Sequence, residues 1–169
     1  LLKIHGIPKI VKEQIDFPFI AVSPHCPIEY VWRDDDMQQA LENPLQKIVE
    51  NYRVEKTRIY ITGLSMGGYG TWTLAARRPD LFAAAVPICG GGDPATVNIL
   101  KNLPIWVFHG GLDGVVLPEE SERMVRALES AGGRVRYTLY PKAYHDSWTK
   151  TYDDPALYDW LLSNRKEEN

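Results

Sequence analysis

Short apolar runs, rich in β-branched residues, alternate along the chain with longer amphipathic stretches. Continuous apolar runs this short are typical of strands that are buried on both faces, as in a parallel sheet. We therefore predict strands at residues 19–22, 58–62, 83–88, 105–108 and 135–140.

The amphipathic stretches carry the signals that begin and end helices. Asn43-Pro44 and Asp154-Pro155 each resemble a cap followed by a first-turn proline. We predict helices at residues 44–52, 65–78, 118–131 and from 155 onward, and a further helix N-terminus at Asp34, Asp35 and Asp36. Alternating strands and helices predict one doubly wound α/β domain over residues 1–169. Ligands of such a domain bind at the carboxyl ends of its strands.

Composition restricts the classes of partner. The 169 residues are 44% hydrophobic and 24% charged, as expected of a folded chain with a sizeable core. A net charge of −3 and scattered Lys and Arg disfavour nucleic acid. No apolar run approaches the roughly 20 residues that span a bilayer. Cys26 and Cys89 are too few for a zinc site or a disulfide scaffold. We interpret them as small buried residues, with a single bridge left open, and predict no metal or cofactor.

The clearest chemical signal is Gly63-Leu64-Ser65-Met66-Gly67, which matches G-x-S-x-G between a predicted strand and a predicted helix. In that position the serine occupies a sharp turn, and glycines at 63 and 67 give it steric room, with Gly68 and Gly70 continuing the small face of the helix. The first helical N–H groups then point at the serine, and the Met66 N–H becomes a donor to an oxyanion. We predict Ser65 to be a nucleophile.

A nucleophilic serine needs a base and a carboxylate that orients it, in the chain order Ser, Asp/Glu, His. His145 follows the last predicted strand and is our choice for the base. His5 and His25 precede Ser65, and we interpret His109, which ends a strand, as a structural residue beneath the site.

For the carboxylate, strand order favours Asp113, which follows the predicted strand at 105–108. Asp93 is a weaker candidate, and Asp146 is too close to His145 in sequence for good geometry. A turn or a helix cap is the ordinary role of such loop aspartates.

Three segments together carry a resemblance to a known family: GLSMGGYGTW at 63–72, FHGGLDGVV at 108–116 and YHDSW at 144–148. They resemble the phospholipase/carboxylesterase and dienelactone-hydrolase branch of the α/β hydrolases, most of all bacterial esterases sometimes described as peptidases. The resemblance implies a cofactor-free carboxylic-ester hydrolase that works through an acyl-enzyme. By motif, Ser65 is its nucleophile, Asp113 its orienting acid and His145 its base.

The sequence departs from this family at its beginning. Family members carry a His-Gly-rich loop before the segment that matches residues 1–27, and its backbone supplies the second oxyanion donor. That loop follows a strand that lies between those matching 19–22 and 58–62. Neither the loop nor this strand is present in the sequence. A strand slot left open would expose unpaired backbone groups. The chain also opens without an initiator Met. We therefore expect the natural protein to extend upstream of Leu1, or another segment or protomer to fill the slot.

Aromatic residues near the predicted site suggest how a substrate is held. We predict that Trp32 and Trp148 contact it, while Trp72 packs in the core, and that Tyr30 and Tyr69 can meet an aromatic acyl group. No lid is inserted between the strands, which favours small or short-acyl esters. Two alternatives stay open: a serine peptidase of related fold, and a catalytically silent interaction module. The sequence assigns neither substrate, compartment nor oligomeric state.

Overall fold

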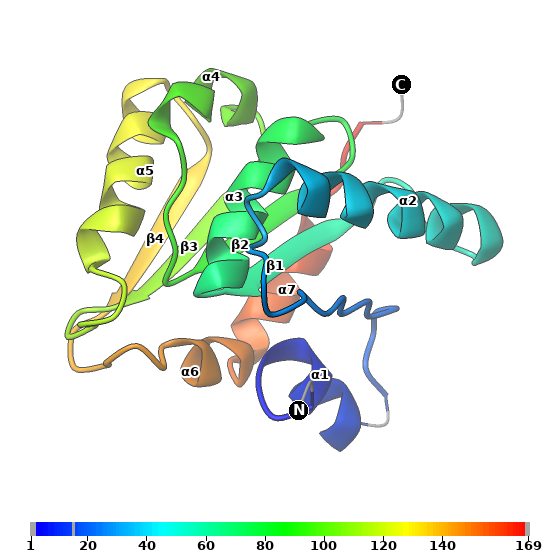
Figure 1. Cartoon of the computed structure of the whole chain (residues 1–169), viewed down its shortest axis with the longest axis horizontal. Coiled ribbons are helices and arrows are strands. Elements are labelled where there is room, and N and C mark those ends of the chain that lie inside the picture. The colour runs from blue at the N-terminus through cyan, green and yellow to red at the C-terminus, as the bar shows by residue number, and fades with distance from the viewer. Residues whose placement is uncertain (1–2, 15, 168–169) are drawn as a thin grey trace.

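The computed structural model describes residues 3–14 and 16–167, so Leu1 and Leu2, where we noted the unusual start, lie outside the described residues. Four parallel strands form one sheet in the order β1-β2-β3-β4 (Figure 1). They are β1 (Tyr60–Leu64), β2 (Ala84–Ile88), β3 (Ile105–Gly110) and β4 (Val135–Tyr140). Four of the five predicted strands are thus confirmed, within two residues at each end.

Helices cover both faces of the sheet (Figure 1). On one face lie α2 (Asp35–Asn51), α3 (Met66–Arg77), the 3₁₀ turn η1 (Pro94–Thr96), α4 (Val97–Leu100) and α5 (Pro118–Ser130). The other face is covered by α1 (Gly6–Glu13), α6 (Trp148–Tyr152) and α7 (Pro155–Ser163). Each face has its own buried cluster, the first around Trp72 and Met124 and the second around Phe108 and Leu157. The predicted α/β architecture is confirmed, and so is the core position of Trp72.

The predicted strand at residues 19–22 is wrong, because among the described residues this segment pairs with no strand. Its apolar side chains divide between two environments. Phe19 packs against the rings of Tyr60 and Tyr158, whereas Ile20 and Val22 are 59% and 51% exposed. An apolar run becomes a buried strand only where a neighbouring strand can pair with it. Within the described residues, β1 has a partner on one side only.

The helix predicted from Pro44 begins nine residues earlier, at Asp35, and Pro44 lies inside it. Asp34 occupies the cap position, and Asp35 and Asp36 lie in the first turn, where negative charge complements the helix dipole. The prediction of a helix N-terminus at these aspartates is therefore confirmed. Helices α3, α5 and α7 agree with prediction within one residue at their starts, and the Asp154 carboxylate caps α7 by accepting from the Ala156 N–H.

Two smaller expectations can be compared with the structure. Cys26 and Cys89 are free thiols, so the bridge that the sequence left open does not form. Among the residues described, no helix combines the length and apolar character needed to cross a bilayer.

Candidate active site

Ser65 lies in the turn between the end of β1 and the start of α3. Its backbone has φ 51° and ψ −116°, in a region that residues with a Cβ rarely occupy. The turn is tied to the neighbouring strand, because the Ser65 N–H donates to the Ile88 carbonyl at 2.9 Å. The sequence therefore folds locally into the sharp strand-to-helix turn that the motif predicts.

The glycines around Ser65 serve different purposes. A Cβ on Gly63 would overlap the carbonyl of Gly67, so this position accepts no side chain. Gly68 lets α3 cross β2 closely, since its Cβ would lie 2.5 Å from the Ile88 oxygen. Gly70 makes room for Trp32 instead, because a Cβ on Gly70 would lie 2.6 Å from the Trp32 side chain. At Gly67 a Cβ would meet nothing within 4 Å, so the steric need predicted there is not confirmed.

His145 connects the serine to a carboxylate. Its Nε2 lies 2.9 Å from Ser65 Oγ, and its Nδ1 lies 2.7 Å from Asp113 Oδ2. The tautomer with hydrogen on Nδ1 fits both contacts, because Nδ1 then donates to the carboxylate and Nε2 accepts from the serine hydroxyl. The structure thus brings together the three residues that the sequence selected from distant parts of the chain.

Asp113 is buried, and its second oxygen is fixed by the backbone. Oδ1 accepts from the N–H groups of Val115 at 2.9 Å and Val116 at 3.0 Å. Burial opposes ionisation, but the hydrogen bonds from His145 and from these two N–H groups outweigh it and hold the pKa of Asp113 below its usual value. The carboxylate is therefore ionised at neutral pH, as an orienting acid must be.

His109 supports Asp113 from below. Its Nε2 lies 3.2 Å from Asp113 Oδ2 and 2.9 Å from the Val116 carbonyl, while Nδ1 lies 2.7 Å from Ser121 Oγ. The Ser121 hydroxyl in turn donates to the Gly90 carbonyl at 2.9 Å, so the ring is fixed between Ser121 on one side and Asp113 and Val116 on the other. The fully buried side chain agrees with our interpretation of His109 as a structural residue beneath the site.

The remaining aspartates considered from sequence have ordinary capping roles. Asp93 accepts from the Ala95 N–H at the start of η1. Asp146 accepts from the N–H and hydroxyl of Thr149 in the first turn of α6. Neither is hydrogen-bonded to His145 in the described structure.

Two further side chains surround the imidazole. Trp148, the first residue of α6, meets the ring of His145 edge to face. Cys89, which follows β2 with a φ of 40°, is fully buried, and its sulfur lies within 4.8 Å of a ring nitrogen of His145. Burial raises the pKa of the Cys89 thiol to about 12, so the thiol is protonated at neutral pH. No sequence pattern indicates that Cys89 belongs to this site, because its neighbourhood depends on how β2 and β3 pair.

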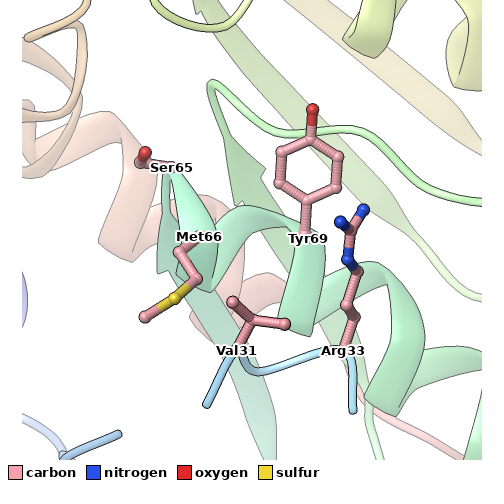
Figure 2. Close-up of a pocket in the computed structure, with 5 residues that line it drawn as sticks. All are labelled: Val31, Arg33, Ser65, Met66 and Tyr69. Atoms are coloured by element: carbon pink, nitrogen blue, oxygen red, sulfur yellow. The ribbon is translucent and has the colours of Figure 1, made fainter. Parts of the chain in front are cut away.

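A pocket of about 340 Å³ opens beside Ser65, lined by Val31, Arg33, Met66 and Tyr69 (Figure 2). The Arg33 guanidinium lies 5.7 Å from the centroid of the Tyr69 ring, within the range of a cation–π contact. Burial raises the pKa of Tyr69, and the carboxylate of Glu120 adds to this effect. The wall of the pocket is thus part apolar and part cationic.

The residues predicted to touch substrate occupy different places. Trp32 is not among the residues that line the pocket; it packs against Gly70, and its carbonyl accepts from the Gln38 amide. Its neighbours Val31 and Arg33 line the pocket instead, and our sequence reasoning missed both. Tyr69 is a lining residue, as expected of an aromatic contact, and Tyr30 is not. Substrate contact by Trp32 and Trp148 stays a prediction.

Comparison with known proteins identifies the family. The model of the dienelactone hydrolase family matches residues 27–160. The chain belongs to the dienelactone hydrolase family. The match includes Ser65, Asp113 and His145, and the fold is that of the α/β hydrolases.

Three similar proteins illustrate this family membership. The structure of a thermostable esterase is 44% identical, with a TM-score of 0.75 over 78% of this chain and 37% of that one. A carboxymethylenebutenolidase-like protein of Escherichia coli O157:H7 is 32% identical over an alignment of 97 positions, which covers 52% of this chain and 36% of that protein. Acetylxylan esterase A of Aspergillus awamori is 25% identical over an alignment of 144 positions, which covers 77% of this chain and 46% of that protein. The chain therefore spans less than half the length of these relatives.

Proposed function

We propose that this dienelactone hydrolase family chain is the catalytic part of a serine carboxylesterase that hydrolyses small or short-acyl esters through an acyl-enzyme. The observation that carries the proposal is the continuous hydrogen-bonded path from Ser65 Oγ through His145 to Asp113. A strained turn presents the serine, and a buried carboxylate with a lowered pKa fixes the tautomer of the base.

In the first half of the reaction, Ser65 Oγ attacks the ester carbonyl while its proton moves to Nε2 of His145. The imidazolium that forms is stabilised by the Asp113 carboxylate. The negative charge on the carbonyl oxygen lies near the start of α3, where the Met66 N–H is the expected donor. The alcohol leaves with the proton from Nε2, and the acyl group stays on Ser65. Water then repeats the sequence and releases the acid.

The pocket supports a small substrate. Its volume of about 340 Å³ and its apolar lining by Val31 and Met66 suit a short acyl or alcohol group beside Ser65. Similarity to an acetylxylan esterase points in the same direction. Trp32 and Trp148 are proposed as further contacts around this pocket.

Active-site labelling tests the proposal directly. A fluorophosphonate probe should label the intact wild-type protein, and the Ser65→Ala variant should take up none. Failure of the wild type to react would favour the catalytically silent alternative. Matched ester and amide substrates then distinguish esterase from peptidase.

The preference for acyl length has its own test. Across p-nitrophenyl esters of increasing length, we expect kcat/KM to peak among short chains and to fall for long ones. A specificity that keeps rising beyond about ten carbons, where an acyl chain no longer fits a pocket of this size, would contradict the short-acyl part of the proposal.

A further inference from the structure

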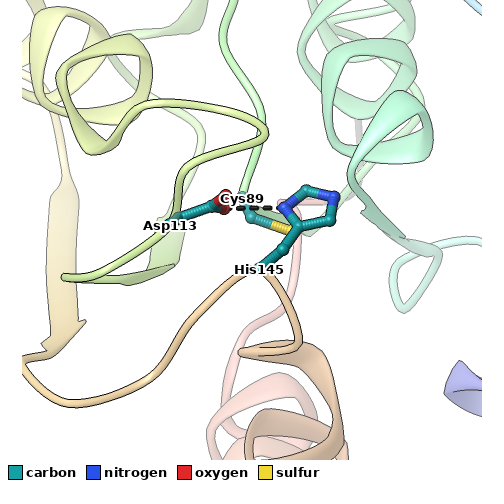
Figure 3. A group of neighbouring side chains, drawn as sticks. All are labelled: Cys89, Asp113 and His145. Carbon is teal, nitrogen blue, oxygen red and sulfur yellow. Dashed lines mark hydrogen bonds and ion pairs between the residues drawn. The ribbon is translucent and has the colours of Figure 1, made fainter.

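The thiol of Cys89 lies beside the Asp113–His145 pair (Figure 3). The cysteine sulfur, a carboxylate oxygen of Asp113 and a ring nitrogen of His145 all lie within 4.8 Å of one another. The proposed reaction uses the last two groups and gives the thiol no task.

Sulfur, imidazole nitrogen and carboxylate oxygen are the three donor types that bind zinc in proteins. Donors to one zinc ion lie about 2.0–2.3 Å from it, and in tetrahedral coordination two of them are about 3.5 Å apart. The cluster therefore needs only a small movement of side chains to enclose an ion. A soft thiolate in the set favours zinc and cadmium over magnesium and calcium.

A buried hydroxyl supports the same place. Ser147 is 0% exposed, and within the described residues its hydroxyl has no partner other than the Cys89 thiol. The hydrogen bond from Ser147 favours the thiolate of Cys89 and partly opposes the effect of burial. The thiolate is the form of cysteine that binds a metal ion.

We propose that Cys89, Asp113 and His145 form an inhibitory site for a thiophilic divalent cation such as zinc, with Ser147 beside it. The ion takes Nδ1 of His145 and an oxygen of Asp113, and it displaces the thiol proton of Cys89, which is released to solvent. The proton formerly on Nδ1 moves to Nε2, so the imidazole stays neutral. A ring with hydrogen on Nε2 no longer accepts the Ser65 proton, and turnover stops.

Access to this site is restricted. The thiol and the carboxylate are buried, and of the three ligands only the His145 side chain, 20% exposed, is reached by solvent. The imidazole must therefore move before the ion enters. We expect inhibition by zinc to develop over time and to be reversed slowly by a chelator.

Binding is tested without an activity assay. Cadmium ions added to the intact protein should produce the ultraviolet charge-transfer band of a cadmium–thiolate bond, with one proton released per ion. In Cys89→Ser this band should be lost, whereas in Cys26→Ser, which removes the other thiol, it should remain. Loss of the band in Cys26→Ser with retention in Cys89→Ser would overturn the proposal.

The inhibitory part rests on the proposed esterase activity. With p-nitrophenyl acetate, Cys89→Ser should need at least about tenfold more zinc for half inhibition than wild type, and Cys26→Ser should behave as wild type. Equal sensitivity in all three proteins overturns the site. If the cadmium band depends on Cys89 but metal-free protein neither reacts with fluorophosphonate nor cleaves esters, the proposed function fails while metal binding stands.

Discussion

The indole of Trp148 meets the imidazole of His145 edge to face, with 5.2 Å between the ring centroids and 90° between the planes. The same indole contacts His5 at 5.8 Å. In the proposed reaction the imidazole of His145 passes a proton between Ser65 and the leaving group. It is held by a hydrogen bond to Asp113 and by the edge-to-face contact with Trp148. This contact gives Trp148 a positioning role in addition to the substrate contact that we predict for it.

We expect Trp148→Ala to lower kcat about tenfold with little change in KM, because an edge-to-face pair contributes about 1 kcal/mol and the freed imidazole loses orientation. Trp148→Phe should keep most of the activity, since a smaller ring can still present its edge. Steady-state kinetics with a short ester measure both variants. A rise in KM with unchanged kcat would indicate that Trp148 acts by binding substrate only.

The glycines of the serine turn allow a matched comparison. Gly63→Ala should destabilise the protein by about 3 kcal/mol, because its Cβ overlaps the Gly67 backbone. Gly67→Ala places a methyl group in open space within α3 and should change stability by less than about 1 kcal/mol. Urea unfolding followed by circular dichroism measures both. Similar losses in the two variants would contradict the steric argument.

Backbone strain at Ser65 predicts a difference between two inactive variants. At a φ of 51°, glycine avoids a steric cost that alanine keeps. We expect Ser65→Gly to be more stable than Ser65→Ala by about 1 kcal/mol, with fluorophosphonate labelling absent in both. A higher melting temperature for Ser65→Ala would show that the turn is not strained.

The lowered pKa of Asp113 predicts how stability depends on pH. The unfolded carboxyl titrates near 3.9 and the folded one below that value, so the folded state binds protons less readily. The stabilisation is complete above the unfolded pKa and is lost as pH falls through the folded pKa. The difference in unfolding free energy between wild type and Asp113→Asn should therefore shrink as pH falls from about 5 to about 2. A difference that stays constant over that interval would contradict this.

The sequence allowed the three residues of the hydrogen-bonded path to be predicted, because each follows a parallel strand of the sheet. The carboxyl ends of such strands meet at one edge of the sheet, whatever the distance in sequence. His145 could be preferred over His109 for the same reason, since a residue in the loop can reach over the serine and one inside a strand cannot.

Other features depended on contacts that no local pattern contains. The run at 19–22 has strand composition but no pairing partner among the described residues. At α2, three aspartates at the N-terminus mark the start of the helix, and Pro44 is accommodated inside it. Arg33 and Cys89 reach the site only because their segments pack against α3 and β3, so sequence spacing gave no signal for either.

The position of β1 at the border of the described sheet has a consequence for the proposed chemistry. Within the described residues β2 is the one strand that pairs with β1, and the Ser65 N–H is anchored to that same neighbour. An outermost strand frays more easily than a central one, and here it carries the reacting oxygen of the proposed chemistry. A strand added alongside β1 is therefore expected to stiffen the nucleophile as well as to extend the sheet.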